Sequence, residues 1–444
     1  MGKPRNLHPR PAADAMPEEA EVAIASLDPE GRGVGDHPAL PGRTLAVAGA
    51  LPGDRVRVAL NLQGHARLLD VLEASPARIA SDCRFHGPCG GCDLIAFAYP
   101  ACAQAKAGLV AATVAAVPGG CDELLPFRAA PATTGYRHRA RLHQSRSHGR
   151  PDAGYLPARG RGIVSVDRCL LLVPALQSRL IALREGIANL PFRVEEVRVA
   201  AATEGKEKVA AHVELARGVS ANRAKSALTR LLEPCRLIGL TAGPAGRGVE
   251  LALGNPRLGG AVAPGLPNGP YQFEPCHFTQ GNAAMNVELV AAVRDFAAIA
   301  ADERVVELYA GCGNLTLPLA HAGARVFAIE GDPGAVRMAH KNVARANVKE
   351  RVRLAEGPAT ELWRHAEREP AVLLLDPPRE GCGAVGRIVR DLLPTRVVHV
   401  ACDLRSFARD AASLTNEGYR LRRAVGLDLY PRTHHIELVA LFTR

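Results

Sequence analysis

The stretch VVELYAGCGNLTLPLAHAG, residues 305–323, decides the fold of the C-terminal region. An apolar run typical of a buried strand ends at Gly311 and Gly313, and an apolar run typical of a helix follows. Glycines at such a turn let the backbone approach a ligand beside a helix N-terminus. Seventeen residues after Gly313, the next strand-like run ends at Glu330, where an acid can accept hydrogen bonds from ribose hydroxyls. Two glycines alone could form an ordinary tight turn, but the combination predicts a nucleoside-binding site.

The sequence around this stretch alternates between strand-like and helix-like runs from about residue 270 onward. Five strand-like runs are each followed by a helix-like run, and YRLRRAVGLDLY and HIELVALFTR close the sequence with a short gap between them. Alternation of this kind predicts a parallel sheet with helical crossovers, and the short gap predicts an antiparallel closing pair. We therefore expect an α/β Rossmann-like domain over residues 269–444.

The nucleoside site favours S-adenosylmethionine over other nucleotides. The sequence has no G-x-G-x-x-G with a small residue behind it and no Walker lysine, so a dinucleotide or a triphosphate fits poorly. The fourth strand-like run ends at Asp376-Pro377-Pro378-Arg379, at the edge where methyl donor and acceptor meet in adenosylmethionine enzymes. Amino-group methyltransferases usually carry an aromatic residue after the two prolines, and Arg379 stands there instead. This departure argues against methylation of an exocyclic amine.

The fifth strand-like run, in VVHVACDLRSFARD (residues 397–410), leads into Cys402. A cysteine there is either a small core residue or a nucleophile aimed into the site. Beside a methyl donor, a thiolate can add to C6 of uracil and raise the electron density at C5, which then takes the methyl group. A base must remove the C5 proton before the thiolate can leave. Glu437 is the expected base, with His434 and His435 as alternatives.

The N-terminal half is organised differently. We expect a disordered leader over residues 1–20, a small all-β barrel over residues 21–78 and a mixed central region over residues 79–268. The leader lacks the apolar segment of a secretory signal, and no apolar run is long enough to cross a bilayer, so a cytoplasmic protein is expected. The net charge of +10 and an arginine-rich stretch from Arg128 to Arg168 favour contact with RNA or DNA over a merely solvated face.

The chain has eleven cysteines, which are not expected to form disulfides in the cytoplasm. Cys83, Cys89 and Cys92 follow a C-x5-C-x2-C spacing among glycines, and Cys169 is the expected fourth ligand. From the residues alone, an iron–sulfur cluster and a tetrahedral zinc ion are about equally compatible with this set. The remaining cysteines, apart from Cys402, are expected to be small packing residues.

These motifs give the sequence a resemblance to the bacterial RNA 5-methyluridine (uracil-C5) methyltransferases, most closely the iron–sulfur group that acts on large-subunit ribosomal RNA. The resemblance covers nearly the whole chain after the leader and includes FTQGN, ELYAGCGNLTLPLA, AIEGD, LLLDPPREG, VACDLRSFARD and LDLYPRTHHIE, in family order. It implies a Rossmann-like adenosylmethionine-dependent methyltransferase domain, an N-terminal TRAM- or OB-like barrel that binds RNA, and a central α+β iron–sulfur domain.

The resemblance also implies roles for individual residues. Cys402 is implied as the nucleophile and Glu437 as the general base. The residues implied to line the methyl-donor and uracil site are Gln280, Tyr309, Gly311, Gly313, Asn314, Glu330 and Asp376. The cysteines implied to hold a [4Fe-4S] cluster are Cys83, Cys89, Cys92 and Cys169. Two positions depart from the family pattern: Asp403-Leu404 stands where Asn-Pro usually follows the nucleophile, and Pro358 lies where a polar side chain often contacts the adenine.

The expected function is S-adenosylmethionine-dependent methylation of C5 of a specific uridine in ribosomal RNA of the large subunit, by an enzyme expected to be monomeric. The same reaction on transfer RNA is the first alternative. The cluster cysteines favour ribosomal RNA, because bacterial transfer-RNA enzymes of this family usually lack them. An RNA-binding assembly protein without activity is the second alternative, and retention of Cys402, Glu437, Asp376 and Gln280 argues against that loss.

Overall fold

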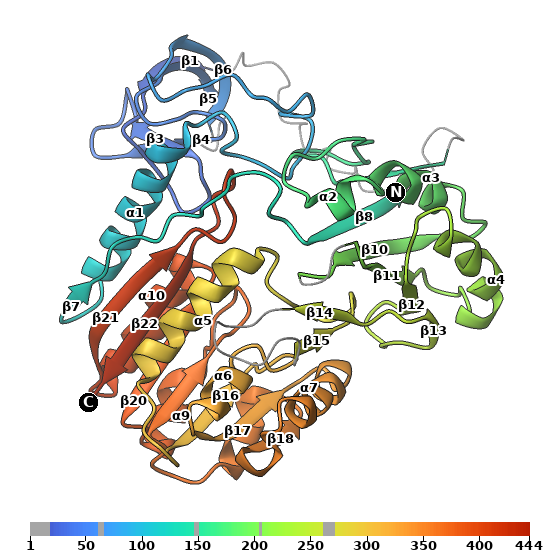
Figure 1. Ribbon diagram of the computed structural model, residues 1–444. Coiled ribbons are helices and arrows are strands. Elements are labelled where there is room, and N and C mark those ends of the chain that lie inside the picture. The colour runs from blue at the N-terminus through green and yellow to red at the C-terminus, as the bar shows by residue number, and fades with distance from the viewer. Residues whose placement is uncertain (1–17, 61–65, 146–150, 204–206, 261–270) are drawn as a thin grey trace, which may run out of the picture. The chain divides into compact units, whose positions relative to one another are not determined.

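The computed structural model describes residues 18–60, 66–145, 151–203, 207–260 and 271–444 (Figure 1). The chain divides into two units, residues 1–78 and 79–444. Most of the expected leader, residues 1–17, lies outside the described residues. Its last three residues begin the first strand instead, because Glu18 to Ala20 are in register with Leu60 to Val58 of a neighbouring strand.

The first unit is built on a sheet whose described strands run in the order β1-β5-β6-β4-β3-β2. Neighbouring strands are antiparallel, except for the parallel pair β4 and β6. Along β5, Val56 and Val58 are buried in a small apolar core, while Arg55 and Arg57 face solvent and pair with acids of β1 and β6. This alternation has the period of two that a strand with one buried face requires. The strands are β1 (Glu18–Ala23), β2 (Ser26–Leu27), β3 (Gly33–Asp36), β4 (Thr44–Val47), β5 (Arg55–Leu60) and β6 (Ala66–Glu73).

The second unit contains a large mixed sheet with the strand order β18-β17-β16-β19-β20-β22-β21-β7 among the described residues (Figure 1). The strands from β18 to β20 are parallel, and β22 is antiparallel to both β20 and β21. The predicted parallel sheet with an antiparallel closing pair is therefore confirmed. Its strands are β7 (Cys121–Leu124), β16 (Arg304–Leu308), β17 (Arg325–Glu330), β18 (Val352–Glu356), β19 (Val372–Leu375), β20 (Arg396–Ala401), β21 (Arg420–Leu427) and β22 (Glu437–Thr443).

Helices cover both faces of this sheet. Val372 and Leu374 of β19 pack in the same apolar cluster as α5, α6 and α7, whereas Leu373 and Leu375 pack with α1, α9 and α10. Because both faces are covered, the strands read as continuous apolar runs in the sequence. The helices are α1 (Tyr99–Ala115), α5 (Ala283–Ala297), α6 (Thr316–His321), α7 (Pro333–Arg345), α8 (Ala359–Leu362), α9 (Val385–Leu392) and α10 (Leu404–Asn416).

One part of the expected central region belongs to the large sheet. Strand β7 pairs in parallel with β21, and Val110 and Val114 of α1 are buried among residues of α10 and β21. The sequence placed both elements in the region 79–268, apart from the Rossmann-like domain. The structure differs because the apolar face of α1 is covered only when β21 and α10 pack against it.

The rest of the central region forms a second sheet with the order β13-β12-β11-β10-β8-β9 among the described residues. Its core is filled by Leu183 and Ile187 of α3 and by Leu228 of α4, together with the strands. The elements are β8 (Arg139–Ser145), β9 (Asp152–Gly154), α2 (Pro174–Gln177), α3 (Leu180–Ala188), β10 (Val194–Ala201), β11 (Val209–Leu215), α4 (Ala221–Leu232), β12 (Gly239–Pro244), β13 (Leu251–Gly254), β14 (Leu258–Gly260) and β15 (Tyr271–Phe273). Strands β14 and β15 pair with each other, and β15 is followed by α5.

Candidate active site and cysteine cavity

The carboxyl ends of the parallel strands bring the predicted site residues to one edge of the large sheet. The register pairs the last residues of β16 with those of β17 and β19. Tyr309, Glu330 and Asp376 therefore leave the sheet side by side, and Cys402 follows β20 at the same edge. Ligands of open α/β sheets bind at this edge. We call these side chains, together with Gln280, Asn314 and Glu437, the edge site.

The glycine turn after β16 is held by the predicted ribose acid. One carboxylate oxygen of Glu330 accepts a hydrogen bond from the backbone N of Gly311 at 2.8 Å, and the other accepts from the N of Asp332 at 2.7 Å. Tyr309, Gly311 and Gly313 all have positive φ, which is costly for the tyrosine. A Cβ built on Gly311 would meet nothing within 4 Å, so the turn faces open space. Such a turn, with spare acceptor capacity on Glu330, fits the adenosine part of S-adenosylmethionine.

Gln280 and Asn314 lie beside each other at the edge site and line one small cavity. The side chain of Asn314 exchanges two hydrogen bonds of 2.9 Å with that of Asn286 on α5. The carbonyl oxygen of Gln280 accepts a hydrogen bond of 3.3 Å from the hydroxyl of Tyr430. The sequence singled out neither Asn286 nor Tyr430, although Tyr430 lies within the motif LDLYPRTHHIE.

Cys402 directly follows the last residue of β20, and Glu437 is the first residue of β22. The antiparallel register pairs Ala401 with Leu438, and the next step brings Cys402 opposite Glu437. Burial raises the pKa of the Cys402 thiol to about 12, with the charges of Glu437 and Asp376 adding to the shift and that of Arg379 opposing it. The thiol, two carboxyl groups and one guanidinium therefore share one site.

The carboxyl groups of this site bind a proton more tightly than exposed carboxyl groups do. Burial raises the pKa of Asp376 to about 7. Burial and the neighbouring Asp376 raise the pKa of Glu437 well above its ordinary value. Perturbed acids beside a cysteine are typical of sites that move protons.

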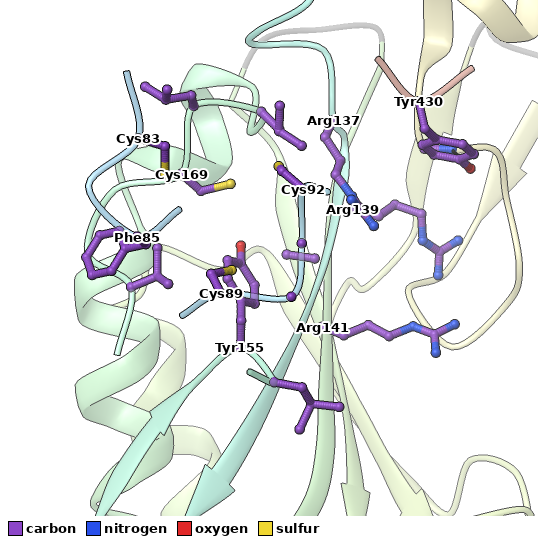
Figure 2. Close-up of a pocket in the computed structure, with 18 of the residues that line it drawn as sticks. Cys83, Phe85, Cys89, Cys92, Arg137, Arg139, Arg141, Tyr155, Cys169 and Tyr430 are labelled. Carbon is purple, nitrogen blue, oxygen red and sulfur yellow. Dashed lines mark hydrogen bonds between the residues drawn. The ribbon is translucent and has the colours of Figure 1, made fainter. Parts of the chain in front are cut away.

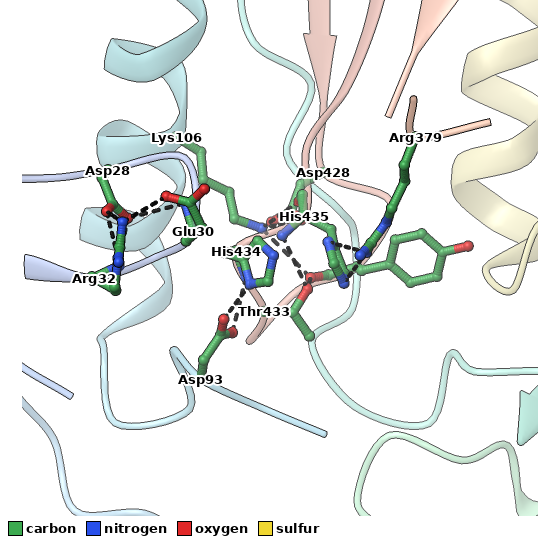
Figure 3. Close-up of polar contacts among 11 residues, drawn as sticks. Asp28, Glu30, Arg32, Asp93, Lys106, Arg379, Asp428, Thr433, His434 and His435 are labelled. Carbon is green, nitrogen blue, oxygen red and sulfur yellow. Dashed lines mark hydrogen bonds and ion pairs between the residues drawn. The ribbon is translucent and has the colours of Figure 1, made fainter. Parts of the chain in front are cut away.

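The rings of the two histidines that were alternatives to Glu437 already have polar partners (Figure 3). The ring of His434 pairs with the carboxylate of Asp93, and its backbone N donates to the same group at 2.9 Å. The ring of His435 lies 2.9 Å from the guanidinium of Arg379, and burial lowers its pKa to about 3. The geometry therefore favours Glu437, which is opposite Cys402, as the base.

A further acid that the sequence analysis passed over lies beneath the edge site. Glu307 of β16 is 2% exposed, and burial raises its pKa to about 8, with smaller contributions from Asp376 and Glu330. Its Oε2 has no hydrogen-bond partner among the described residues. The signal in the sequence was an acid inside an otherwise apolar strand.

The four predicted cysteine ligands line a single cavity of about 340 Å³ (Figure 2). Cys83, Cys89 and Cys92 approach it from one loop and Cys169 from a second, and none of them forms a disulfide. Gly90 lets the first loop pass close to Pro157, whose carbonyl oxygen would lie 3.0 Å from a Cβ at that position. The backbone N of Cys169 donates to Gln177 at 2.8 Å, which fixes the second loop.

The chemistry of this cysteine cavity fits a thiolate-bound metal centre. Burial raises the pKa of Cys92 to about 12, and the charges of Cys169 and Cys89 raise it further, so the sulfur atoms lie within electrostatic reach of one another. Four cysteines are the number of sulfur ligands that a [4Fe-4S] cluster or a tetrahedral zinc ion requires.

Comparison with known proteins places the chain in a family. It is 33% identical over 443 residues, covering 95% of both chains, to a protein of Edwardsiella ictaluri named 23S rRNA (uracil(1939)-C(5))-methyltransferase RlmD. A protein of the same name from Alkalilimnicola ehrlichii is 33% identical over 100% of this chain and 99% of its own. The chain belongs to the RNA (uracil-C5)-methyltransferase family.

The other comparisons agree with this assignment. A family model described as tRNA (Uracil-5-)-methyltransferase matches residues 268–444 of the enzyme. Its fold is similar to that of the Pyrococcus abyssi tRNA (uracil-54, C5)-methyltransferase solved with S-adenosyl-L-homocysteine, with a TM-score of 0.70 and 21% identity over 96% of this chain and 100% of the other. The fold is thus that of the S-adenosylmethionine-dependent methyltransferases.

No helix within the described part of the enzyme is long and apolar enough to span a membrane.

Part of the arginine-rich stretch serves the structure of the enzyme. The guanidinium of Arg139 donates to the carbonyl oxygens of His277 at 2.6 Å and Pro275 at 2.9 Å, and to the hydroxyl of Thr279 at 2.6 Å. Arg139 therefore clamps the loop that carries Gln280. RNA contact by the arginine-rich stretch stays a prediction, and Arg141, two residues later, is exposed.

One cysteine expected only to pack has a more polar environment. Ligand atoms of Glu274, Cys276 and His277 lie within 4.8 Å of one another. Burial lowers the pKa of His277 to about 4, and the charges of Arg337 and Lys341 lower it further. Because these two cations also oppose the binding of a metal ion, we assign no metal to this group.

The departure after Cys402 has a structural role. Asp403 caps the N-terminus of α10, where its carboxylate accepts hydrogen bonds from the backbone N of Arg405 at 3.0 Å and of Ser406 at 2.9 Å. The cap fixes the turn between Cys402 and the helix without an Asn-Pro sequence.

Proposed function

We propose that this enzyme methylates C5 of a uridine in ribosomal RNA of the large subunit, with S-adenosylmethionine as methyl donor. The observation that carries the proposal is the placement of Cys402 opposite Glu437, beside Asp376, at the carboxyl edge of the sheet. This is the set of groups that C5 methylation needs: a nucleophile for C6 and a base for the C5 proton.

The proposed reaction begins at Cys402. Its thiolate forms a bond to C6 of the uracil, and the electron pair of the C5–C6 double bond moves toward C5. When bound, S-adenosylmethionine would supply an electrophilic methyl group; C5 takes it, the bond between that methyl group and the sulfonium breaks, and S-adenosylhomocysteine leaves. Glu437 then removes the C5 proton, the double bond reforms, and the C6–sulfur bond breaks to return the thiolate. The thiol must lose its proton to solvent before the addition. The charge of Arg379 favours that loss, whereas burial and the charges of Glu437 and Asp376 oppose it.

The methyl-donor site is proposed from the same edge. Glu330 and the turn at Gly311 and Gly313 accept the adenosine, while Tyr309, Asn314, Gln280 and Asp376 surround the reacting groups. The fold of the adenosylmethionine-dependent methyltransferases and the open space beside Gly311 support this placement.

The cysteine cavity is proposed to hold a [4Fe-4S] cluster on Cys83, Cys89, Cys92 and Cys169. We assign it a structural or RNA-positioning role, because the C-x3-C-x2-C spacing of radical adenosylmethionine enzymes is absent from the sequence. The first unit is proposed to be the small β-barrel that binds RNA. The net charge of +10 supports a polyanionic partner, and we propose a monomer that works in the cytoplasm.

Transfer RNA is the second candidate substrate, because the family model and one solved structure with this fold are named for transfer RNA. The relatives that match the whole chain are named for uracil 1939 of 23S ribosomal RNA, which favours the large subunit.

The test uses RNA that carries 5-fluorouridine. Fluorine replaces the proton that Glu437 must remove, so the reaction stalls as a covalent protein–RNA adduct. Wild type and Cys402→Ala are incubated with S-adenosylmethionine and either a large-subunit RNA fragment or transfer RNA, and are resolved on a denaturing gel. An adduct with the ribosomal fragment in wild type alone supports the proposal, and an adduct with transfer RNA alone supports the second candidate. Methyl transfer without any adduct would place the chemistry at nitrogen or oxygen.

A further inference from the structure

Tyr430 connects the edge site to the cysteine cavity. It lies in the loop between β21 and β22, and its hydroxyl donates to the carbonyl oxygen of Gln280 at 3.3 Å. The same hydroxyl accepts a hydrogen bond from the backbone N of Gly281, also at 3.3 Å. A Cβ at Gly281 would lie 3.2 Å from the tyrosine ring, so the glycine allows the ring to rest against the backbone beside Gln280.

The other side of the tyrosine ring meets an arginine of the cysteine cavity. The guanidinium of Arg137 lies 5.8 Å from the centre of the Tyr430 ring (Figure 2). Arg137, Tyr430 and Gly281 line the same cavity as the four cysteines. A cation over an aromatic face is held by the ring quadrupole, and a thiolate-bound cluster, which carries net negative charge, would hold the same cation from the opposite side.

The backbone around Arg137 reinforces this connection. On one side, its N donates to the carbonyl of Leu171 at 2.7 Å, two residues after Cys169. On the other side, the next residue, His138, donates its N to the carbonyl of Gly281 at 2.8 Å. One short segment is thus hydrogen-bonded both to the loop of a cysteine ligand and to the loop of Gln280.

The hydroxyl of Tyr430 determines which end of the Gln280 amide faces the ligand. The N–H of Gly281 can only donate, so Tyr430 accepts there and has one proton left to give. That proton is used only if Gln280 presents its carbonyl oxygen, which turns the amide nitrogen of Gln280, a donor, toward the site.

We propose that Tyr430 is a positioning residue that orients the Gln280 amide as a donor to an acceptor oxygen of the reacting ligands. We also propose that Arg137 holds the ring of Tyr430 against the cysteine cavity. This inference rests on the proposed function. The acceptor is an oxygen of uracil or of the methyl donor's carboxylate, and the experiment separates these two sources.

The first experiment compares Tyr430→Phe with Tyr419→Phe in the cluster-loaded enzyme. Tyr419 is a matched control, because its buried hydroxyl donates to the carbonyl of Pro394 at 2.6 Å, away from Gln280. We expect Tyr430→Phe to lower kcat/KM for RNA methylation about tenfold, the value of one oriented hydrogen bond, and Tyr419→Phe to leave it unchanged. Iron content and the absorption spectrum of the cluster are expected to match wild type in both variants.

Calorimetry with S-adenosylhomocysteine identifies the acceptor without depending on turnover. A roughly tenfold weaker Kd in Tyr430→Phe assigns the acceptor to the methyl donor's carboxylate. An unchanged Kd with a lower kcat/KM for RNA assigns it to uracil. If neither quantity changes, the proposal for Tyr430 is wrong. A wild-type enzyme that binds S-adenosylhomocysteine but forms no 5-methyluridine would overturn the proposed function instead, and the Kd comparison would still test Tyr430.

A double-variant cycle tests whether Tyr430 acts through Gln280. With the same Kd and kcat/KM readouts, Tyr430→Phe should have no further effect once Gln280→Ala is present. Arg137→Gln should weaken the same quantity as Tyr430→Phe, and the two losses should not add. Additive losses would show that Arg137 and Tyr430 act independently, and the proposal that Arg137 acts through Tyr430 would be wrong.

Discussion

The edge site and the cysteine cavity lie in the same unit but are held in place by different means. Cys402 and Asp376 directly follow the ends of sheet strands and Glu437 begins one, so the register of the large sheet determines their separation. The four cysteines of the cavity lie on loops, where only scattered hydrogen bonds fix the backbone. We infer that the edge site is formed by the fold itself, whereas the cavity depends on its ligand for rigidity.

The strongest test of a site formed by the fold is removal of its proposed nucleophile. Cys402→Ala should lower 5-methyluridine formation by about a thousandfold or more, because the proposed addition to C6 needs this thiolate. The midpoint of thermal unfolding should stay near that of wild type, because the sheet register does not depend on this side chain. Cys235→Ala, which removes a buried thiol from the core of the central sheet, is the control for activity. Retained methylation in Cys402→Ala would refute the thiolate mechanism.

Removal of the base should give the next largest effect. Glu437→Gln keeps the shape of the side chain but cannot take the C5 proton, so turnover should fall by about 10²- to 10⁴-fold. The stalled intermediate should appear as a covalent adduct with ordinary, unfluorinated RNA on a denaturing gel. His434→Ala is the comparison, because its ring is engaged by Asp93. An adduct that accumulates in His434→Ala and not in Glu437→Gln would identify His434, rather than Glu437, as the base.

Removal of a cysteine from the cavity, unlike removal of Cys402, should lower the stability of the enzyme. Cys92→Ser removes one sulfur ligand, and we expect loss of bound iron, a lower midpoint of thermal unfolding and a fall in methyl transfer of about tenfold. Protease cleavage near the cysteine loops should increase, while S-adenosylhomocysteine binding at the edge site should persist. Cys102→Ser alters a buried thiol that does not line the cavity and serves as control. Unchanged stability after loss of iron would show that the loops are rigid without a ligand.

The smallest effect concerns the pH dependence of stability. Burial raises the pKa of Glu307 from 4.5 to about 8, so the folded state binds its proton more tightly than the unfolded state does. The stabilisation is complete below pH 4.5 and is lost as the pH rises through about 8. Glu307→Gln should flatten this decline when thermal unfolding is followed across that range. Glu367→Gln, at an exposed position, should leave the curve unchanged. An identical slope in Glu307→Gln would show that Glu307 does not titrate in this way.

The sequence could predict the edge site because the information is local. The strand-like runs end at Glu330 and Asp376 or lead into Tyr309 and Cys402, and parallel strands place such ends together. The spacing of Cys83, Cys89 and Cys92 is also local. The parallel arrangement of the strands and the closing antiparallel pair followed from the same runs.

Contacts between distant segments were beyond such reasoning. The pairing of β7 with β21 joins residues some 300 positions apart, and no periodicity in either segment indicates it. Arg139 looked like one of many exposed arginines, but its hydrogen bonds to the Gln280 loop depend on the packing of β8 against that loop. Tyr430 was hidden for the same reason, since its partners lie 149 and 150 residues earlier.

The placement of α1 and β7 has a consequence for how the chain is synthesised. Lys106 of α1, which is 1% exposed, donates to Asp428 at 2.7 Å, and its partner is made 322 residues later (Figure 3). Until β21 and the following loop leave the ribosome, α1 has neither its apolar cover nor its counter-ion, so the nascent enzyme exposes this helix through most of translation. Premature termination between Gly254, where β13 ends, and Asp428 should therefore yield a product that quality-control proteases remove, even though the central sheet is complete.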